Sequence, residues 1–288
     1  MKPISRPLAM FGAIALYSVG TYFAGAGSAM AQTVGIAAVV RNDVKLSTTA
    51  KPVLHPAVVR DRVSLGNDIV TGAASMTQLL LLDQTSFSVG AKARVRIDRF
   101  VYDPSQRASS VAATVAKGAF RFMSSPSLHA RPGQSAIRTP VASIGIRGTI
   151  VEGVVGKDAI GIARREAAIT GAFNADEETA TLVVLRGPGR NAQGQTVQGA
   201  IDVSANGVTI PLEEGGLAVF IPGPNQPPIG PFRISSAGLS RLHEMLRLPP
   251  LRGDKQLRVP GPVTDRQLEL PDFGRQDGQF DPVGTPRP

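Results

Sequence analysis

Short apolar runs fill most of this chain, and glycine, asparagine, aspartate or proline interrupts them every few residues. Helical periodicity is almost absent before residue 235, so the runs are typical of β-strands joined by tight turns. Residues 93–98 alternate between apolar and charged side chains, as expected of a strand with one face in water. Asn206-Gly207 stands between two apolar runs and is a strong hairpin signal. The sequence therefore predicts an all-β domain.

The form of this domain stays open at two points. Gly145, Gly148, Gly153 and Gly156 indicate tight corners or close approach of strands, which suits either a β-sandwich or a β-solenoid-like fold. Residues 111–122 have an alanine-rich first half that permits a helix, whereas the second half alternates like a strand. Further strands are expected at residues 167–173, 181–185, 201–204, 208–212 and 217–221.

The composition changes after residue 222 and divides the chain into further parts. We expect a β domain over residues 32–222, a Pro/Gly linker and one short helix over 223–250, and a tail over 251–288. The helix is predicted at residues 236–248, where leucines and a methionine form an apolar stripe, and Pro249-Pro250 ends it. The tail is rich in Pro, Gly, Arg, Asp and Gln and has little to bury, so we expect it to be disordered.

The first 31 residues combine the three parts of a secretory signal peptide. Lys2 and Arg6 precede an uncharged apolar run at residues 8–27, and Ala29-Met30-Ala31 offers a small-x-small cleavage pattern. We therefore expect cleavage after Ala31 and a periplasmic or secreted protein. The alternative is a retained membrane anchor, because the run is long enough to cross a bilayer at about 20 residues.

Composition excludes several classes of function. The chain has no cysteine, so disulfides, thiolate metal sites and thiol catalysis are excluded. Its formal net charge is +9, but the basic residues are scattered and no aromatic platform accompanies them, so we expect no nucleic-acid partner. Outside the cytoplasm the polyanions that such a charge attracts are lipid headgroups, lipopolysaccharide and cell-wall polymers.

Candidate catalytic and metal-binding residues are few. His55, His129 and His243 lack the spacing of a metal motif, so we expect no metal and no cofactor. Asp68 and Asp83 could form the carboxylate pair of a glycosidase, but both occupy turn positions where aspartate is favoured for its own backbone hydrogen bonds. We predict no catalytic residue. An envelope polysaccharide hydrolase that uses these two carboxylates is the alternative.

Arg147 is unusual because it lies in a glycine-rich strand among isoleucines. A guanidinium in such surroundings is costly unless it is paired. We expect Arg147 to bond strand carbonyls or a carboxylate and to fix the register of its neighbours, and a role in binding an anionic ligand is the alternative. On the structural interpretation, Arg147→Ala lowers the melting temperature by at least a few degrees.

Four segments resemble, in order, the motifs of FecR-type domains. They are residues 63–72 (VSLGNDIVTG), 79–90 (LLLLDQTSFSVG), 117–121 (KGAFR) and 139–149 (TPVASIGIRGT). Residues 199–204 and 208–215 look like the strands that close the domain, so the resemblance covers roughly residues 34–221. Asn67 inside the Gly-Asp corner and Gln84 after Asp83 depart from the family pattern. The motif positions are Gly66, Asp68, Thr71, Gly72, Asp83, Gly90, Gly118, Thr139, Pro140, Gly145, Arg147, Gly148 and Thr149.

The resemblance implies an exported β domain of sensing or scaffolding type, with no catalytic residues to transfer. Sigma-regulating members of the family carry a cytoplasmic domain ahead of a membrane helix, whereas seven residues precede the apolar run here, so we expect no sigma factor as partner. We expect a non-catalytic domain that binds another envelope protein or a polyanionic envelope polymer through strand edges and basic loops. A surface structural protein that interacts through its Pro-rich tail is a further alternative.

Overall fold

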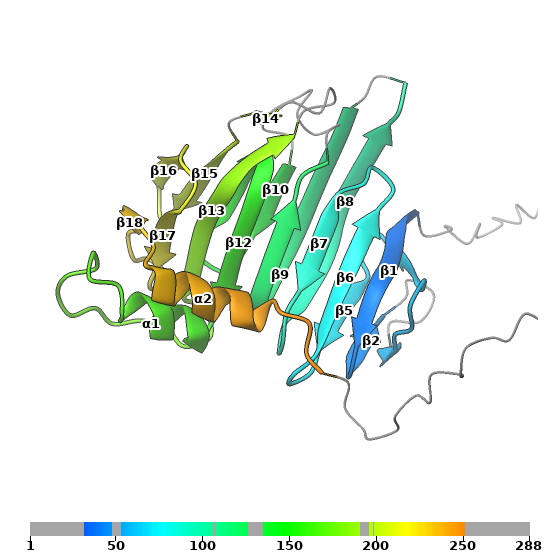
Figure 1. Ribbon diagram of the computed structural model, residues 1–288, viewed down its shortest axis with the longest axis horizontal. Helices are drawn as coiled ribbons and strands as arrows, with labels where there is room; N and C mark the ends of the chain where they lie inside the picture. Colours follow the sequence, from blue (N-terminus) through cyan, green and yellow to red (C-terminus); the bar gives the residue numbers. More distant parts are fainter. Residues whose placement is uncertain are drawn as a thin grey trace, which may run out of the picture. The chain divides into compact units, whose positions relative to one another are not determined.

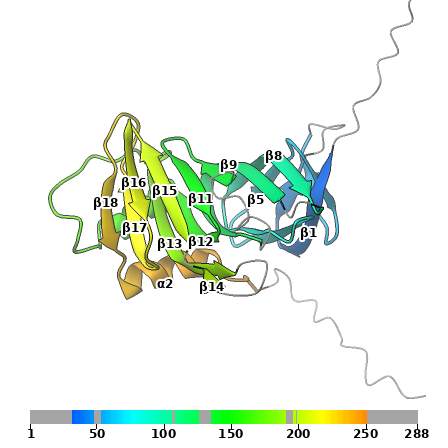
Figure 2. The same ribbon diagram turned by 90° about the horizontal axis from the view of Figure 1, so that it is seen from above.

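The computed structural model describes residues 32–47, 53–105, 108–125, 135–190, 196–197 and 199–250. They form two β-sheets, A and B, that pack face to face, with helices on the outer side of sheet A (Figures 1 and 2). The leader at residues 1–31, His129 and the tail at residues 251–288 lie outside the described residues, so the expectations about them stay predictions.

Sheet A is antiparallel throughout. Its strands run in the order β4 (Arg62–Ser64), β1 (Thr33–Arg41), β6 (Met76–Leu81), β7 (Ser86–Val89), β9 (Ala108–Met123), β12 (Thr149–Val155), β13 (Thr181–Arg190), β17 (Leu217–Ile221) and β18 (Ile229–Arg233). The short β14 (Thr196–Val197) pairs with the end of β13.

Sheet B is antiparallel except for the pair β9–β10. Its strands run in the order β3 (His55–Pro56), β2 (Val44–Leu46), β5 (Asp68–Thr71), β8 (Arg94–Asp103), β9, β10 (Ser135–Arg138), β11 (Ser143–Arg147), β15 (Ala200–Ala205) and β16 (Val208–Leu212). The hairpin predicted at Asn206-Gly207 is confirmed, because this dipeptide joins β15 to β16 with both residues at positive φ.

One long strand, β9, belongs to both sheets. Residues 108–117 pair with β8 in sheet B, and residues 118–123 pair with β7 and β12 in sheet A. The change of sheet falls at Gly118, where φ is +83° and a Cβ would lie 2.4 Å from the Cα of Ala93. The helix permitted by the alanines in this segment is therefore wrong, because the segment gains strand partners on both sides and buries Val115, Phe120 and Phe122.

The core between the sheets is aliphatic, with a small aromatic group at its centre. Phe87, Phe120 and Phe122 are at most 1% exposed, and the ring of Phe87 lies 6.3 Å and 5.8 Å from the other two. Valine, isoleucine and leucine from both sheets complete this core. The all-β prediction is confirmed, and of its two forms the structure has two stacked sheets, as in a sandwich.

A second apolar layer lies on the outer face of sheet A, where α1 (Lys157–Ala163) and α2 (Ser236–Met245) pack. Leu182 and Val184 of β13 face the helices, whereas Val183 and Leu185 face sheet B. Strands covered on both faces read as continuous apolar runs, which β13 does. Among the described residues, no helix has the length and apolar character needed to cross a membrane.

The C-terminal helix was predicted, and the structure confirms it as α2. Ser235 caps its first turn by accepting a hydrogen bond from the backbone N–H of Gly238 at 3.0 Å. Glu166, only 3% exposed, accepts bonds from the backbone N–H and the hydroxyl of Ser235 at 2.8 and 2.9 Å. A buried carboxylate thus fixes the start of α2 on the domain.

Three elements differ from the expectations. The helix α1 was not foreseen, because its seven residues are too few to show a clear period. Residues 167–173 form no strand but a loop, whose apolar character reflects packing of Phe173 against Phe220 at 5.1 Å. The strand β18 forms where a Pro/Gly linker was expected; it is an edge strand, the position in a sheet that tolerates Pro231.

Candidate binding surface

One line of polar side chains crosses seven neighbouring strands on the outer face of sheet B. Register places the following residues directly opposite one another: Asp68 on β5, Arg96 on β8, Thr114 on β9, Arg138 on β10, Ser143 on β11, Ser204 on β15 and Thr209 on β16. We call this set the polar row. Strand spacing gives it a length of about 29 Å.

Alternation along each strand produces the row. Val95 and Ile97 flank Arg96 and are buried, and Ile144 beside Ser143 is buried in the same way. Because successive side chains of a strand point to opposite faces, the polar residues between these apolar ones must face outward. The sequence pattern therefore predicts the wet face, and pairing of the strands lines up its residues.

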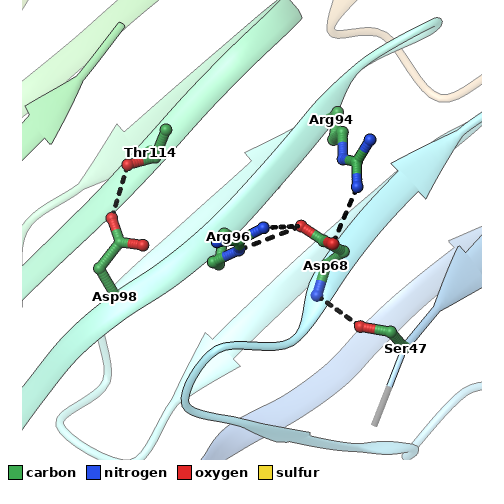
Figure 3. A network of polar contacts seen from close by, with 6 residues as sticks. All are labelled: Ser47, Asp68, Arg94, Arg96, Asp98 and Thr114. Carbon is green, nitrogen blue, oxygen red and sulfur yellow. Dashed lines mark hydrogen bonds and ion pairs between the residues drawn. The ribbon is translucent and has the colours of Figure 1, made fainter. Parts of the chain in front are cut away.

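Asp68 is the centre of the best-ordered part of the row (Figure 3). Its Oδ2 accepts a hydrogen bond from Nη2 of Arg94 at 2.9 Å, and its Oδ1 accepts two from Nε and Nη2 of Arg96 at 3.1 Å. The backbone N–H of Asp68 donates to Oγ of Ser47 at 2.8 Å. One carboxylate thus orients two guanidinium groups, each about half exposed, on the surface.

The two arginines also set the charge state of Asp68. Partial burial by itself would raise the pKa of the Asp68 carboxyl, but the hydrogen bonds and positive charges of Arg94 and Arg96 outweigh burial and lower that pKa. The same pairing raises the pKa of Arg94. Asp68 and Arg94 therefore stay ionised throughout the neutral range. On the next strand pair, Thr114 donates to Oδ2 of Asp98 at 2.6 Å (Figure 3).

Arg138 lies in the middle of the polar row and is the one arginine of the row without a partner among the described residues. In the next row along the sheet, Arg138 has the small residues Ala112, Ala136 and Gly145 beside it, and Arg99 and Asp202 continue that row on either side. A long cationic side chain therefore rises beside a short stretch of small residues. Such a group is available to an incoming carboxylate or phosphate.

Arg147 was expected to bond either strand carbonyls or a carboxylate, and it pairs with carboxylates. Its Nη2 lies 3.2 Å from Oδ1 of Asp202 and 3.8 Å from Oε1 of Glu213. The side chain is 38% exposed because Arg147 lies on the wet face of β11, while Ile144 and Ile146 face the core. The expectation that Arg147 has apolar surroundings was therefore wrong, because only the other face of β11 is apolar.

The threonines of the FecR-like motifs hold corners of the backbone. Thr71 donates to the carbonyl of Gly90 at 2.5 Å and accepts from the N–H of Ala93 at 2.9 Å. Thr139 accepts from the N–H of Ala142 at 3.1 Å, and the hydroxyl of Thr149 donates to the carbonyl of Gly187. These residues position strands, and their side chains are buried.

The glycines of the motifs lie mostly where the chain turns or touches another segment. At Gly90 a Cβ would lie 2.5 Å from the carbonyl oxygen of Met245, so this position lets the end of α2 approach β7. Gly66 and Gly148 lie in turns at positive φ, Gly72 lies against Asp43, and Gly145 lies on the open face of β11. Pro140 lines a small pocket of about 230 Å³ together with Val141, Asn206 and Gln226.

The structure does not bring Asp68 and Asp83 together. Asp83 lies in the β6–β7 turn of sheet A and is 2% exposed. Its carboxylate accepts from the N–H and hydroxyl of Thr85 at 2.9 and 2.7 Å and from the hydroxyls of Ser109 and Ser125 at 2.5 and 3.2 Å. Each aspartate therefore serves a separate hydrogen-bond network, and neither has the partner that a carboxylate pair requires.

Sequence reasoning missed a buried ionic cluster around Glu152, which is 1% exposed. Its Oε1 lies 2.6 Å from Nε of Arg121, and its Oε2 lies 3.3 Å from Nε of Arg186 and 3.3 Å from Nε2 of His243. The four residues come from β9, β12, β13 and α2. The one signal in the sequence was a glutamate inside the apolar strand TIVEGVV.

The remaining histidine with a described position is His55, on the short strand β3. In the ranges that the structure describes, no three His, Asp or Glu side chains gather in a way that could hold a metal ion.

Comparison with known proteins identifies the central part of the chain. The family model described as FecR protein matches residues 67–187, which include the polar-row residues Asp68, Arg96, Thr114, Arg138 and Ser143. No curated protein matches the chain.

Two crystal structures of a "putative anti-sigma factor" from Parabacteroides distasonis ATCC 8503 match at 15% and 14% identity, each with a TM-score of 0.35. Each match covers 56% of this chain and 57% of the solved one, so the chain spans little more than half the length of these structures. The family match places a FecR domain at residues 67–187 of this chain.

Proposed function

We propose that this chain is an exported, non-catalytic domain of sensing or scaffolding type that binds another envelope protein through the outer face of sheet B. The polar row is the observation that carries the proposal. It spans about 29 Å of open sheet surface, and five of its residues lie in the FecR domain. The FecR domain supports a role in signalling, and the leader supports export.

The row is prepared for recognition because its charged groups are already held in place. Asp68 fixes Arg94 and Arg96, and both side chains are about half exposed. Side chains that are ordered before binding lose less conformational entropy when the partner arrives. Arg138, which has no partner of its own in the described structure, then offers the strongest site for a carboxylate of the partner.

Strand edges are less suitable than this face, although the sequence favoured them. The edge strands of the described sheets are β4 and β18 in sheet A and β3 and β16 in sheet B. Pro56, Pro211 and Pro231 lie in three of them. Proline lacks the N–H that strand addition needs, so these edges resist pairing with another chain.

In-cell photocrosslinking tests the proposed face. A photoreactive residue in place of Ser143, which is exposed in the middle of the row, is expected to form a crosslink to an envelope protein. Arg138→Glu is expected to reduce this crosslink at least about tenfold, as for a central interface arginine. Arg241→Glu is the matched control, because Arg241 is an exposed arginine on α2, on the sheet A side of the domain.

The alternatives predict different results. Loss of the crosslink in both arginine variants would show a general effect of charge and would contradict the proposed face. Salt-sensitive binding of heparin, used as a polyanion probe and reduced by Arg138→Glu, would favour an envelope polymer instead. A crosslink that disappears when residues 251–288 are deleted would favour the tail as the interaction element.

A further inference from the structure

A second surface lies on the outer face of sheet A, where one row of residues is largely apolar. Register places Ile36 of β1, Leu80 of β6, Ser86 of β7, Met123 of β9 and Ile150 of β12 opposite one another. Leu80 is 42% exposed, Met123 is 39% exposed and the neighbouring Leu82 is 56% exposed. We call Ile36, Leu80, Leu82, Met123 and Ile150 the apolar patch.

The helices cover only part of this face. Leu242 and Leu246 pack with α1 and with the apolar residues of β12, β13 and β17, and the carbonyl of Met245 lies beside Gly90 at the end of β7. In Figure 1, α2 ends in front of β9, and β7, β6 and β1 continue beyond it with no described helix over them. Because sheet faces are covered by helices, the apolar patch has the geometry to receive a helix that continues this layer.

Arginines stand at both ends of the patch. Arg62 on the edge strand β4 lies opposite Ile36, and it is exposed. Near the other end, Arg121 and Arg186 are 30% and 23% exposed, so their guanidinium groups reach solvent while sharing the single carboxylate of Glu152. Three guanidinium groups with one carboxylate leave an excess of positive charge, which selects a partner with carboxylates on both sides of an apolar stripe.

We propose that the apolar patch and these three arginines bind an acidic amphipathic helix of a partner protein. Leucine-like side chains of that helix would cover Leu80 and Met123, and its flanking carboxylates would pair with Arg62 on one side and Arg121 and Arg186 on the other. Methionine and arginine are enriched in protein interfaces, and arginine with carboxylate makes strong paired hydrogen bonds. The patch lies on the opposite side of the domain from the polar row, so a failure here leaves the proposal for sheet B intact.

A designed peptide serves as the probe. It has about 18 residues, or about five helical turns, with leucines on one face and glutamates on both flanks. On titration into the full chain it is expected to shift the methyl NMR signal of Met123. Leu80→Glu and Arg62→Glu are each expected to weaken binding at least about tenfold. Val101→Glu is the matched control, because Val101 is 55% exposed but lies on β8 of sheet B.

Several results would overturn the proposal. One is a Met123 signal that does not move at peptide concentrations up to about 1 mM, because binding would then be weaker than about −4 kcal/mol, too weak for a specific site. Equal binding of a peptide with lysine in place of every glutamate is another. Binding of phosphatidylglycerol vesicles but not of the peptide would reassign the patch to a membrane surface. Self-association of the free protein that Leu80→Glu abolishes would reassign it to a second copy of this chain.

Discussion

At the scale of single residues, the ionic clusters around Glu152 and around Arg147 differ in burial. Glu152 is almost fully buried among Arg121, Arg186 and His243, whereas Arg147 and Asp202 are 38% and 41% exposed. An exposed pair contributes at most about 1 kcal/mol, because water screens it and ordering the side chains costs entropy. Removing one member of a buried pair costs more, since the other charge is left without its partner.

Glu152→Gln is expected to lower the free energy of unfolding by about 2 kcal/mol. This is less than the loss on breaking a fully buried ion pair, because both arginines are partly in contact with water. Urea unfolding at neutral pH measures this loss. Glu244→Gln, an exposed glutamate on α2, is the control and is expected to change little. If both variants unfold at the urea concentration of the parent protein, Glu152 does not hold the layer of helices on sheet A.

Arg147→Ala is now expected to lower the melting temperature by about 2–4 °C at most, since its ion pairs are half exposed. This is the lower end of the effect that the sequence suggested. Thermal unfolding followed by circular dichroism measures it. A loss of more than about 8 °C would mean that Arg147 fixes the register of β11 in a way that its contacts with Asp202 and Glu213 do not explain.

Asp68 gives the fold a pH-dependent contribution in the acid range. Its pKa is lowered from 3.8 in the folded state, so its stabilisation is present at neutral pH and is lost as the pH falls through the lower folded value. Asp68→Asn should therefore lower the melting temperature at pH 6, and the difference from the parent should narrow below about pH 4. Ser47→Ala is the control, because it removes an uncharged hydrogen-bond partner of Asp68 and should give a constant offset.

At the scale of elements, the crossover of β9 depends on Gly118. Gly118→Ala is expected to cost at least about 2 kcal/mol, because alanine is strained at φ +83° and its Cβ would meet Ala93 at 2.4 Å. Gly161→Ala is the matched control: Gly161 lies in α1, nothing lies within 4 Å of its Cβ position, and alanine should stabilise the helix by up to about 1 kcal/mol. Chemical unfolding of both variants should therefore give opposite signs. Two changes of the same sign would contradict this account of the crossover.

Elements with a strong local pattern were predictable from the sequence, and others were not. Residues 94–98 of the alternating segment lie in β8, and the apolar stripe after residue 235 lies in α2. The strand β18 was missed because Gly230 and Pro231 argue locally against a strand, and only the edge position of β18 makes them acceptable.

The site was predictable only in part. Alternation shows that Arg96 and Arg138 face water, but only the pairing of β8, β9 and β10 places them in one row. The cluster around Glu152 joins four elements distant in sequence, so the glutamate in an apolar strand was its only local sign and its partners could not be identified. The departures from the family pattern are local: Asn67 accepts a hydrogen bond from the N–H of Ser64 at 2.8 Å, and Gln84 adopts a positive φ of 72° in its turn.

At the scale of the whole molecule, export is the prediction on which the class of partner depends. The full chain produced in a Gram-negative host is expected to reach the periplasm and to begin at Gln32, because the small residues before it suit signal peptidase. Intact-mass measurement of the purified protein gives the cleavage position directly. A protein that keeps its first 31 residues in the membrane fraction would establish the anchor, and one that keeps them in solution would contradict export.

The sharing of β9 between the two sheets has a consequence for how the domain comes apart. Neither layer can peel away alone, because losing one layer would strip a hydrogen-bonded neighbour from the other. Denaturation should thus follow a single cooperative transition, with the same midpoint for a fluorescent label on either layer. Because the two sheets share a strand, the domain should unfold in one step. At forces too small to unfold it, a partner that pulls on one face should move the whole domain as one rigid body.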